Sequence, residues 1–233
     1  MAAEIKIISA NSMREVIADT KAAFETASGH ALNVTVVETG AIRRRVLAGE
    51  AFDVIMVPRE AADEFERQGK IAAGSQVRLV RVDFGLAVRA NGPHPDTGTP
   101  DALKRAFLAA KIVLITDPAT GGISGVHLME VLGKLGIADA MKAKLVPNRG
   151  GAIHAERVVK GEADLAVQAE HEIRSVPDAA FLEYPMEFQR PIIFMGGVGT
   201  AASDAAAAGA YLKFISGSPE ALAAMKAHHL SHA

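Results

Sequence analysis

Three short stretches of small polar residues each stand between an apolar run and an amphipathic run. They are Ser9–Ser12, Glu38–Gly40 and Thr120–Gly125. If the apolar runs are parallel strands and the amphipathic runs are helices, all three lie at the carboxyl ends of strands, where open α/β sheets bind ligands. A helix that starts there presents unpaired backbone N–H groups and the positive end of its dipole, which suit an anion. The hydroxyl groups available at these turns belong to Ser12, Thr39 and Ser124. Together they predict an anion site, although each turn alone is also explained by an ordinary helix N-cap.

Two longer side chains could contact the same anion. Arg43 follows Gly40 by three residues, and its guanidinium group could grip a carboxylate through two parallel hydrogen bonds. An exposed helical arginine is the alternative interpretation, and the same two interpretations apply to Arg14 and Arg149. Gln168 closes a predicted strand, where its amide could donate a hydrogen bond to a bound oxygen.

Other kinds of chemistry find less support in the sequence. Gly121–Gly125 lacks the lysine of a P-loop, the spacing of a dinucleotide-binding loop and the G-x-S-x-G pattern of a hydrolase. His127 and His154 stand close to the polar turns and could transfer a proton, and a structural role is the alternative for each. Because there is no H-E-x-x-H motif and no carboxylate cluster at ligand spacing, we expect no metal and no cofactor.

The elements that must position these residues alternate along the chain. Apolar runs predict strands, and apolar residues three or four apart predict helices. The first set has strands at 5–8, 32–37 and 52–57, with helices at 13–24 and 41–48. The second set has strands at 84–89, 112–115, 145–147 and 163–168 with helices between them, and helices at 203–214 and 219–227 close the chain. This alternation predicts an α/β protein with parallel sheets covered by helices.

Size and composition limit the architecture and the partners. The chain has 233 residues, of which 49% are hydrophobic, so it can bury a substantial core. The two sets are of similar size with no Ser-rich or Gly-rich linker between them, so we expect two lobes packed across a cleft. Opposite charges are interleaved and the net charge is -2, so we do not expect nucleic acid as a partner. No window approaches the roughly 20 apolar residues of a membrane-spanning helix, and the lack of cysteine excludes disulfides and thiolate sites.

Four motifs, in the same order along most of the chain, resemble those of the molybdate-binding protein family of ABC importers. They are Ser9-Ala10-Asn11-Ser12-Met13, the run GAIRRRVLAGEAFD from Gly40 to Asp53, Thr116-Asp117-Pro118 with Ser124-Gly125, and Gly161-Glu162-Ala163-Asp164. The resemblance implies the type II periplasmic binding fold, an α/β fold of two lobes, each a mainly parallel sheet flanked by helices, joined by two crossover strands that act as a hinge. It places lobe 1 at residues 1–82 plus 196–233 and lobe 2 at residues 83–195.

The resemblance also implies which residues contact the ligand. Family members hold a tetrahedral oxyanion with serine hydroxyls and backbone N–H groups. The matching positions here are Asn11, Ser12 and Met13, Thr39 or Gly40, Ser124 or Gly125, and Ala152 or Ile153. Molybdate binders have a tyrosine where this chain has Gln168-Ala169. In this position, in Arg43 and in Gly150-Gly151, the chain resembles a divergent branch of the family. The resemblance implies carboxylate ligands, and the branch includes an isomerase that interconverts cis- and trans-aconitate.

Two functions stay open on these grounds. The first is a substrate-binding protein that closes around a small anion, either an organic carboxylate or a tetrahedral oxyanion, and then docks on an ABC permease. The second is a cofactor-independent isomerase of an unsaturated acid such as aconitate, in which His127, His154 or Glu38 moves a proton. We favour the first because no residue demands catalysis. We expect a monomer located in the periplasm after loss of a signal peptide, with the cytoplasm as the alternative.

Overall fold

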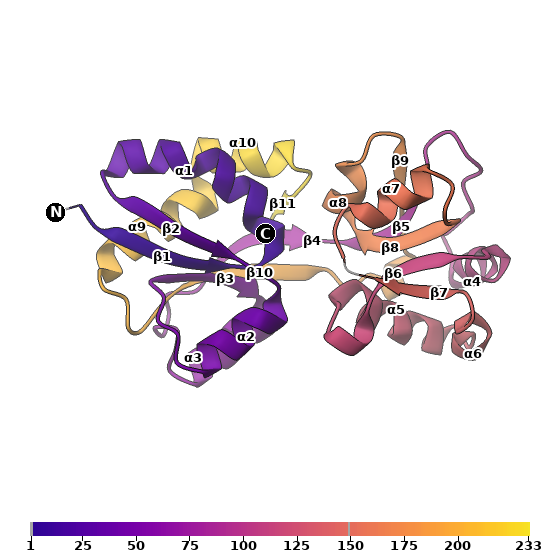
Figure 1. Cartoon of the computed structure of the whole chain (residues 1–233), viewed down its shortest axis with the longest axis horizontal. Helices are drawn as coiled ribbons and strands as arrows, with labels where there is room; N and C mark the ends of the chain where they lie inside the picture. The colour runs from indigo at the N-terminus through magenta and orange to yellow at the C-terminus, as the bar shows by residue number, and fades with distance from the viewer. Residues whose placement is uncertain (1, 149) are drawn as a thin grey trace. The chain divides into compact units, whose positions relative to one another are not determined.

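The chain folds as two compact units, each with its own sheet (Figure 1). The computed structural model describes residues 2–148 and 150–233, so Arg149 lies outside the described residues. Unit 1 consists of the chain up to Arg81 together with Ile192–Ala233, and unit 2 is Val82–Pro191. Two helix-flanked sheets of this kind confirm the α/β fold class.

Unit 1 has a six-stranded sheet in the order β11-β4-β10-β3-β1-β2. Its strands are β1 (Glu4–Ser9), β2 (Ala31–Val36), β3 (Val54–Pro58), β4 (Val77–Val82), β10 (Ile192–Val198) and β11 (Ser231–His232). Its helices are η1 (Asn11–Met13), α1 (Arg14–Ser28), α2 (Thr39–Leu47), α3 (Arg59–Arg67), α9 (Ala205–Gly217) and α10 (Pro219–Ala227). Helices α1, α9 and α10 cover one face and α2 and α3 the other (Figure 1). β1 is parallel to β2 and β3, and β10 is antiparallel to β3.

Unit 2 has a five-stranded sheet in the order β7-β6-β8-β5-β9. Its strands are β5 (Phe84–Arg89), β6 (Val113–Thr116), β7 (Leu145–Asn148), β8 (Leu165–Ala169) and β9 (Ala179–Glu183). Its helices are α4 (Pro100–Ala109), η2 (Pro118–Thr120), α5 (Ile123–Lys134), α6 (Ala138–Met141), α7 (Ile153–Val159), α8 (Glu170–Arg174) and η3 (Met186–Phe188). β6 is parallel to β7 and β8, whereas β5 is antiparallel to β8 and β9. Both sheets are therefore mixed, and in each the three neighbouring parallel strands, β3-β1-β2 and β7-β6-β8, form one side of the sheet.

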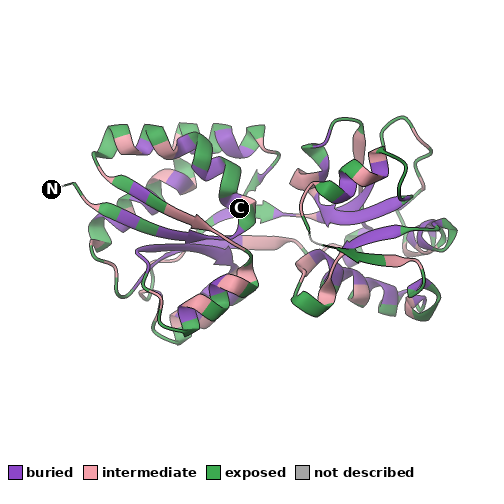
Figure 2. Cartoon of the chain, viewed as in Figure 1, coloured by how far each residue is buried: buried purple, intermediate pink, exposed green. Residues whose placement is uncertain are grey.

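The core of each unit lies along its sheet (Figure 2). All five residues of β3 and all five of β8 are buried, because helices cover both faces of these strands. Helix α1 shows how the helices join this core: its buried side chains recur at helical spacing and its other faces are polar. They are Val16, Ile17, Thr20 and Phe24.

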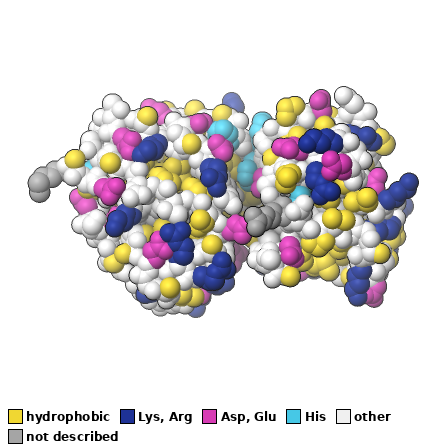
Figure 3. Space-filling model, in the orientation of Figure 1, with side chains coloured by type: hydrophobic (Ala, Val, Ile, Leu, Met, Phe, Trp, Pro, Cys, Tyr) yellow, Lys and Arg dark blue, Asp and Glu magenta, His cyan; other side chains and the backbone are white. Residues whose placement is uncertain are grey.

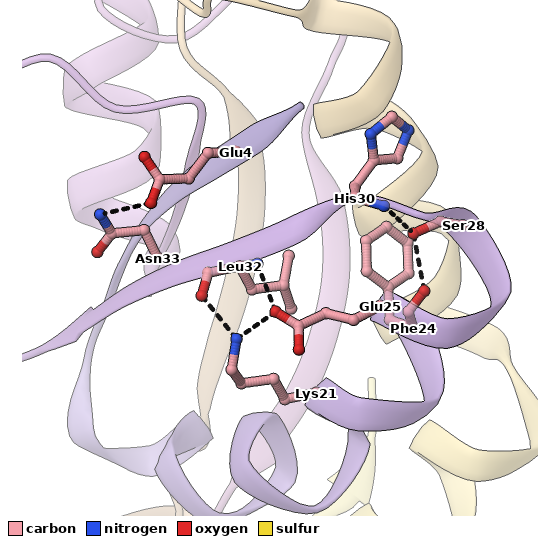
Figure 4. A network of polar contacts seen from close by, with 8 residues as sticks. All are labelled: Glu4, Lys21, Phe24, Glu25, Ser28, His30, Leu32 and Asn33. Atoms are coloured by element: carbon pink, nitrogen blue, oxygen red, sulfur yellow. Dashed lines mark hydrogen bonds and ion pairs between the residues drawn. The ribbon is translucent and has the colours of Figure 1, made fainter. Parts of the chain in front are cut away.

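An ion pair on α1 protects the edge strand of unit 1 (Figure 4). Lys21 and Glu25 pair one turn apart, and both also bond the backbone of β2: Lys21 Nζ donates to the carbonyl of Leu32 at 2.7 Å, and the Leu32 N–H donates to Glu25 Oε1 at 2.7 Å. The hydrogen bond from Lys21, followed by that from the Leu32 amide, holds the pKa of the Glu25 carboxyl below its usual value. The backbone N–H and carbonyl of Leu32, at the open edge of β2, are thus satisfied within the unit.

A buried carboxylate joins distant segments of unit 1. Asp53, only 4% exposed, accepts hydrogen bonds from the N–H of Lys6 at 2.7 Å, the N–H of Ser203 at 2.6 Å and the Ser203 hydroxyl at 2.9 Å. In unit 2 the exposed Asp164 accepts from the N–H groups of Lys111 and Ile112 at 2.7 and 2.9 Å. Each aspartate fixes the start of one parallel strand against its neighbour.

The burial of Asp53 makes its removal costly. We expect Asp53→Ala to lower the free energy of unfolding by about 2–4 kcal/mol, because buried donors left unpaired cost roughly 1–3 kcal/mol each. Asp164→Ala is the matched control and should lose about 1 kcal/mol or less, because water can reach the donors it leaves. Urea unfolding of both variants measures the difference, and equal losses would contradict the role assigned to Asp53.

Candidate functional site

The polar turn after β1 is held in place by its neighbours. The carbonyl of Ser9 accepts from the N–H of Val37 at 3.0 Å, and the N–H of Ala10 donates to the carbonyl of Met56 at 2.8 Å. These bonds tie the end of β1 to the segments on both sides of it. The first predicted turn therefore has a fixed backbone at the carboxyl end of the strand.

The residues that follow have different surroundings. Asn11 is exposed and its Oδ1 accepts from Nη2 of Arg14 at 3.0 Å, which accounts for Arg14 as a local contact. Ser12 is half-buried, and no group of the described residues bonds its hydroxyl. Met13 is fully buried and anchors the turn in the core. Of the three predicted contacts in this turn, Ser12 has the hydroxyl that a ligand can use.

Helix α2 begins at the second predicted turn and leaves two donors without partners. The N–H groups of Ala41 and Ile42 donate to the carbonyl of Glu38 at 2.9 and 3.0 Å. The N–H groups of Thr39 and Gly40 precede the first intrahelical bond and find no acceptor among the described residues. Glu38 itself is exposed, and its side chain makes no capping bond. The helix start therefore offers two N–H groups and the dipole end together.

The three arginines of α2 point to three different places. Arg43 pairs with Glu64 of α3, and this hydrogen bond, before the charge itself, lowers the pKa of the Glu64 carboxyl. Arg45 pairs with Glu50 at 2.5 Å. Arg44 forms no ion pair within the described part of the chain, and its Nη1 lies 3.8 Å from where a methyl group on Gly40 would stand. The guanidinium at the start of the helix is therefore that of Arg44, where the sequence suggested Arg43.

Helix α5 begins beside Thr116, the last residue of β6. The N–H of Gly125 donates to Oγ1 of Thr116 at 2.8 Å, and the hydroxyls of Thr116 and Ser124 lie 2.9 Å apart. The Ser124 hydroxyl also donates to the carbonyl of Val167 at 3.3 Å. These contacts occupy the Ser124 hydroxyl and the Gly125 N–H. The donors left without an acceptor among the described residues are the backbone N–H groups of Ile123 and Ser124.

Gln168 and Glu172 form a polar pair beside the turn that leads into α7, with Gln168 buried and Glu172 half-buried. Gln168 is 0% exposed, and its Nε2 donates to the carbonyl of Gly151 and to Oε2 of Glu172, the latter at 3.4 Å. Its Oε1 has no partner among the described residues. Burial raises the pKa of the Glu172 carboxyl, more than the Ala169 backbone and Gln168 lower it. In the same turn Ala152 is half-buried and Ile153 is exposed.

The histidines considered for proton transfer are both buried in unit 2. His127 is 7% exposed, and its ring meets those of Phe84 and Tyr184 edge-on with centroids 6.1 and 5.7 Å away. Burial lowers the pKa of His127, against a hydrogen bond to the Phe188 backbone that raises it. His154 is fully buried in the first turn of α7, in the same unit. His127 is therefore surrounded by aromatic rings and its charged form is disfavoured.

Sequence reasoning named Thr116 only as part of a motif, and it missed Glu172 and the position of the Arg44 guanidinium group. The four-residue spacing from Gly40 could have identified Arg44, since side chains one turn apart share a helix face. The roles of Thr116 and Glu172 depend on how side chains at the ends of strands meet the helices that follow, which the sequence pattern does not show. A shallow hollow of about 140 Å³ in unit 1 is lined by Gly49–Phe52, Gly69, Lys70 and Gly199–Ala201. It lies where β3 begins, at the opposite edge of the sheet from Ser12.

Residues 2–148 and 150–233 offer neither a metal site nor a membrane-spanning helix. They contain no group of three or more His, Asp or Glu side chains placed to hold a metal ion. None of their helices has the length and apolar character needed to cross a membrane.

Comparisons with known proteins agree on one family. A family model described as bacterial extracellular solute-binding protein matches residues 5–231. An aconitate isomerase from Pseudomonas sp. is 27% identical over 221 residues, which cover 91% of this chain and 81% of that protein. The molybdate-binding protein ModA of Azotobacter vinelandii is 26% identical over 231 residues, which cover 97% of this chain and 89% of the relative.

A solved structure shows the same fold. The periplasmic molybdate-binding protein of Azotobacter vinelandii matches with a TM-score of 0.72 at 19% identity, over 97% of this chain and 98% of that chain. The type II periplasmic binding fold inferred from the sequence motifs is thereby confirmed.

The close approach of α5 to Thr116 yields a stability test. A Cβ on Gly125 would lie 2.0 Å from the Thr116 carbonyl oxygen, so we expect Gly125→Ala to destabilise the protein by at least about 1–3 kcal/mol through overpacking. Gly40→Ala is the control, because its Cβ would meet only Arg44 Nη1 at 3.8 Å. Thermal unfolding should show a change of less than about 0.5 kcal/mol for that variant. A Gly125→Ala protein as stable as the parent would rule out the tight contact.

Proposed function

Because the chain belongs to the bacterial extracellular solute-binding protein family, we propose that it binds a small anion through backbone N–H groups at two helix starts. The observation that carries the proposal is that the first two N–H groups of α2 and the first two of α5 find no acceptor among the described residues. They are those of Thr39 and Gly40 in α2 and of Ile123 and Ser124 in α5. An anion at such a position gains hydrogen bonds and the field of the helix dipole.

The side chains near these donors add to the proposed site. The Ser12 hydroxyl is available for a hydrogen bond, and Arg44 brings the positive charge that α2 does not use internally. We propose Arg43 as a secondary contact, because Glu64 already holds its guanidinium group. We propose supporting roles for the Ser124 hydroxyl and the Gly125 N–H at the start of α5, through their contacts to Thr116, and for Met13 beside Ser12, through its burial in the core. Ala152 and Ile153 remain proposed backbone contacts.

The ligand class follows from chemistry shared by the relatives. Their names refer to molybdate, a tetrahedral oxyanion, and to aconitate, a tricarboxylate. Backbone N–H donors and one guanidinium suit both classes, since each presents several anionic oxygens. We propose an organic carboxylate or a tetrahedral oxyanion as ligand, the periplasm as location and an ABC permease as partner.

On the face shown in Figure 3, positive and negative side chains are interspersed.

Ligand binding can be tested before the anion is identified. A thermal-shift screen with molybdate, tungstate, sulfate, phosphate, citrate and both aconitates should reveal at least one stabilising anion. A ligand at 100 times its Kd stabilises by roughly 2.7 kcal/mol. Calorimetry on that anion should then show about tenfold weaker binding for Arg44→Ala, the value of about 1.4 kcal/mol expected for one charged contact.

Arg45 provides the matched control on the same helix. Because Arg45 is paired with Glu50, Arg45→Ala should stay within about threefold of the parent affinity. Arg43→Ala should fall between the two. A loss confined to Arg43→Ala would restore the assignment suggested by the sequence, and unchanged affinity in all three variants would remove the arginines from the site.

Closure of the two units around the ligand stays a prediction. Hinged binding proteins become more compact when a ligand contacts both domains. Small-angle scattering with and without the anion found in the screen should therefore show a smaller radius of gyration in the bound state. Identical scattering curves at saturating ligand would exclude closure while leaving binding intact.

Glu172 favours a second candidate, isomerisation of an unsaturated carboxylic acid. Desolvation raises the pKa of its carboxyl, which lies beside Gln168, and a carboxyl group can take a proton from one carbon and return it to another. As the proton moves from one end of a three-carbon unit to the other, the double bond moves to the neighbouring pair of carbons, and the substrate is neither oxidised nor reduced. The aconitate isomerase at 27% identity adds support. His154 lies in the same unit, whereas Glu38 is exposed in unit 1.

An isomerisation assay separates the two candidates. If the chain is an enzyme, it should convert cis-aconitate to trans-aconitate, followed by proton NMR, and Glu172→Gln should lower kcat at least about 100-fold, the usual contribution of one acid or base. Glu170→Gln, on the same helix but paired with Arg174, is the control and should keep full activity. No turnover by the parent protein would leave binding as the sole function.

A further inference from the structure

The two units repeat one structural segment. Asp53 directly precedes β3, and Asp164 directly precedes β8. Each aspartate accepts a hydrogen bond from a backbone N–H of the neighbouring parallel segment, that of Lys6 in unit 1 and that of Ile112 in unit 2. In both units the donor stands one residue before the first residue that pairs with β3 or β8. Upstream, each repeat carries an arginine–glutamate pair five residues apart, and in each the glutamate directly follows a positive-φ glycine, Gly49 or Gly161. These pairs are Arg45–Glu50 and Arg157–Glu162. Residues at equal distances after the two aspartates therefore occupy equivalent places.

At two of these places unit 2 has polar residues where unit 1 has apolar ones. Four residues after the aspartate, unit 1 has Val57 and unit 2 has Gln168, and both are 0% exposed. Eight residues after it, unit 1 has the buried Ala61 and unit 2 has Glu172. The fold is thus satisfied by apolar side chains at both places. The polar pair of unit 2 needs another explanation, because a buried polar group without a partner is destabilising.

The orientation of the Gln168 amide is fixed by its neighbours. Its Nε2 faces two acceptors, the carbonyl of Gly151 and the carboxyl of Glu172. Turning the amide over would place Oε1 against these oxygens and lose both hydrogen bonds. The sequence predicted that Gln168 donates to the ligand, but both its N–H groups are used inside the protein. The atom that remains is the acceptor Oε1.

We propose that Gln168 is a specificity residue that selects ligands carrying a hydrogen-bond donor, a hydroxyl or an acid hydrogen, beside the anionic group. This inference rests on the proposed anion-binding function and narrows its ligand class. Oε1 of Gln168 accepts the ligand's hydrogen, and Glu172 is the positioning residue that keeps the amide turned. A ligand without a donor leaves Oε1 unpaired in the complex, which sites with buried polar groups penalise strongly.

Two pairs of anions differ mainly in whether they carry a hydrogen-bond donor, so they test this preference. Phosphate and sulfate are both tetrahedral, but at neutral pH phosphate carries at least one acid hydrogen and sulfate carries none. Citrate and tricarballylate share a carbon skeleton and three carboxylates, but only citrate has a hydroxyl. Calorimetry with the parent protein should show the donor-bearing member binding about tenfold or more tightly in the pair that fits the site.

Variants assign the preference to the proposed atoms. Gln168→Met keeps the side-chain length without the acceptor and resembles the apolar residue of unit 1, so it should fold and bring the two affinities within about threefold. Glu172→Ala should reduce the same ratio while the anion still binds. Gln189→Met is the control, because Gln189 also donates to a backbone carbonyl and has an unpartnered buried Oε1 in unit 2. Its affinity ratio should equal that of the parent.

The outcomes separate this inference from the function it rests on. If anions bind but the donor-bearing member has no advantage, or if the advantage survives in Gln168→Met, the specificity role is wrong and anion binding stands. If no member of either pair and no other small anion binds, the proposed function itself fails. A ratio that collapses in Gln168→Met but not in Gln189→Met supports the assignment.

Discussion

The first N–H groups of a helix have no carbonyl within that helix to bond, and this constraint organises the protein. In a parallel sheet each strand delivers the chain to a helix start at the same edge, so unpaired donors collect there. Some are used internally, as when Thr116 accepts the N–H of Gly125. The first two N–H groups of α2 and the first two of α5 find no acceptor within the described residues. An anion is the ligand that satisfies such groups without an additional cation.

The rest of each unit keeps these donors in place. Asp53 and Asp164 fix the starts of the parallel strands, and the pair of Lys21 and Glu25 protects the edge of β2. The strand ends are equally constrained: the backbone around Ser9 is bonded from both sides. Donors at the carboxyl edge are therefore presented by a rigid frame. Preorganisation of this kind lowers the entropic cost of binding.

The repeated segment explains how one fold can host either a receptor or an enzyme. Unit 1 fills the places after Asp53 with Val57 and Ala61, which contribute packing alone. Unit 2 keeps the same backbone plan but has Gln168 and Glu172 there. The same backbone plan therefore accepts apolar or polar side chains at these two places. This separation of scaffold from chemistry is consistent with the different activities named for the two relatives.

Local sequence patterns predicted what depends on neighbours in the chain. The strand at 84–89 and the helix at 219–227 were predicted with the bounds of β5 and α10, because apolar runs and proline N-termini are local signals. The short elements α8 and β9 were missed because five residues carry little periodicity. The antiparallel pairing of β5 and β10, the Arg43–Glu64 pair and the Gly151–Gln168 contact join distant residues. No pattern in the neighbouring sequence identifies such partners. The sequence analysis therefore expected Gln168 to donate to a ligand, whereas its amide N–H groups bond Gly151 and Glu172 and its Oε1 is left without a partner among the described residues.

The central claim is that backbone N–H groups at two helix starts hold the anion. Backbone amide NMR during titration with the anion found by thermal shift tests it most directly, because the amide proton shift responds to a new acceptor. The account predicts that the amides of Thr39, Gly40, Ile123 and Ser124 move downfield together and saturate at one Kd. Saturable binding that leaves these four unchanged, with shifts gathered instead around the hollow near Gly69 and Gly199, would contradict it.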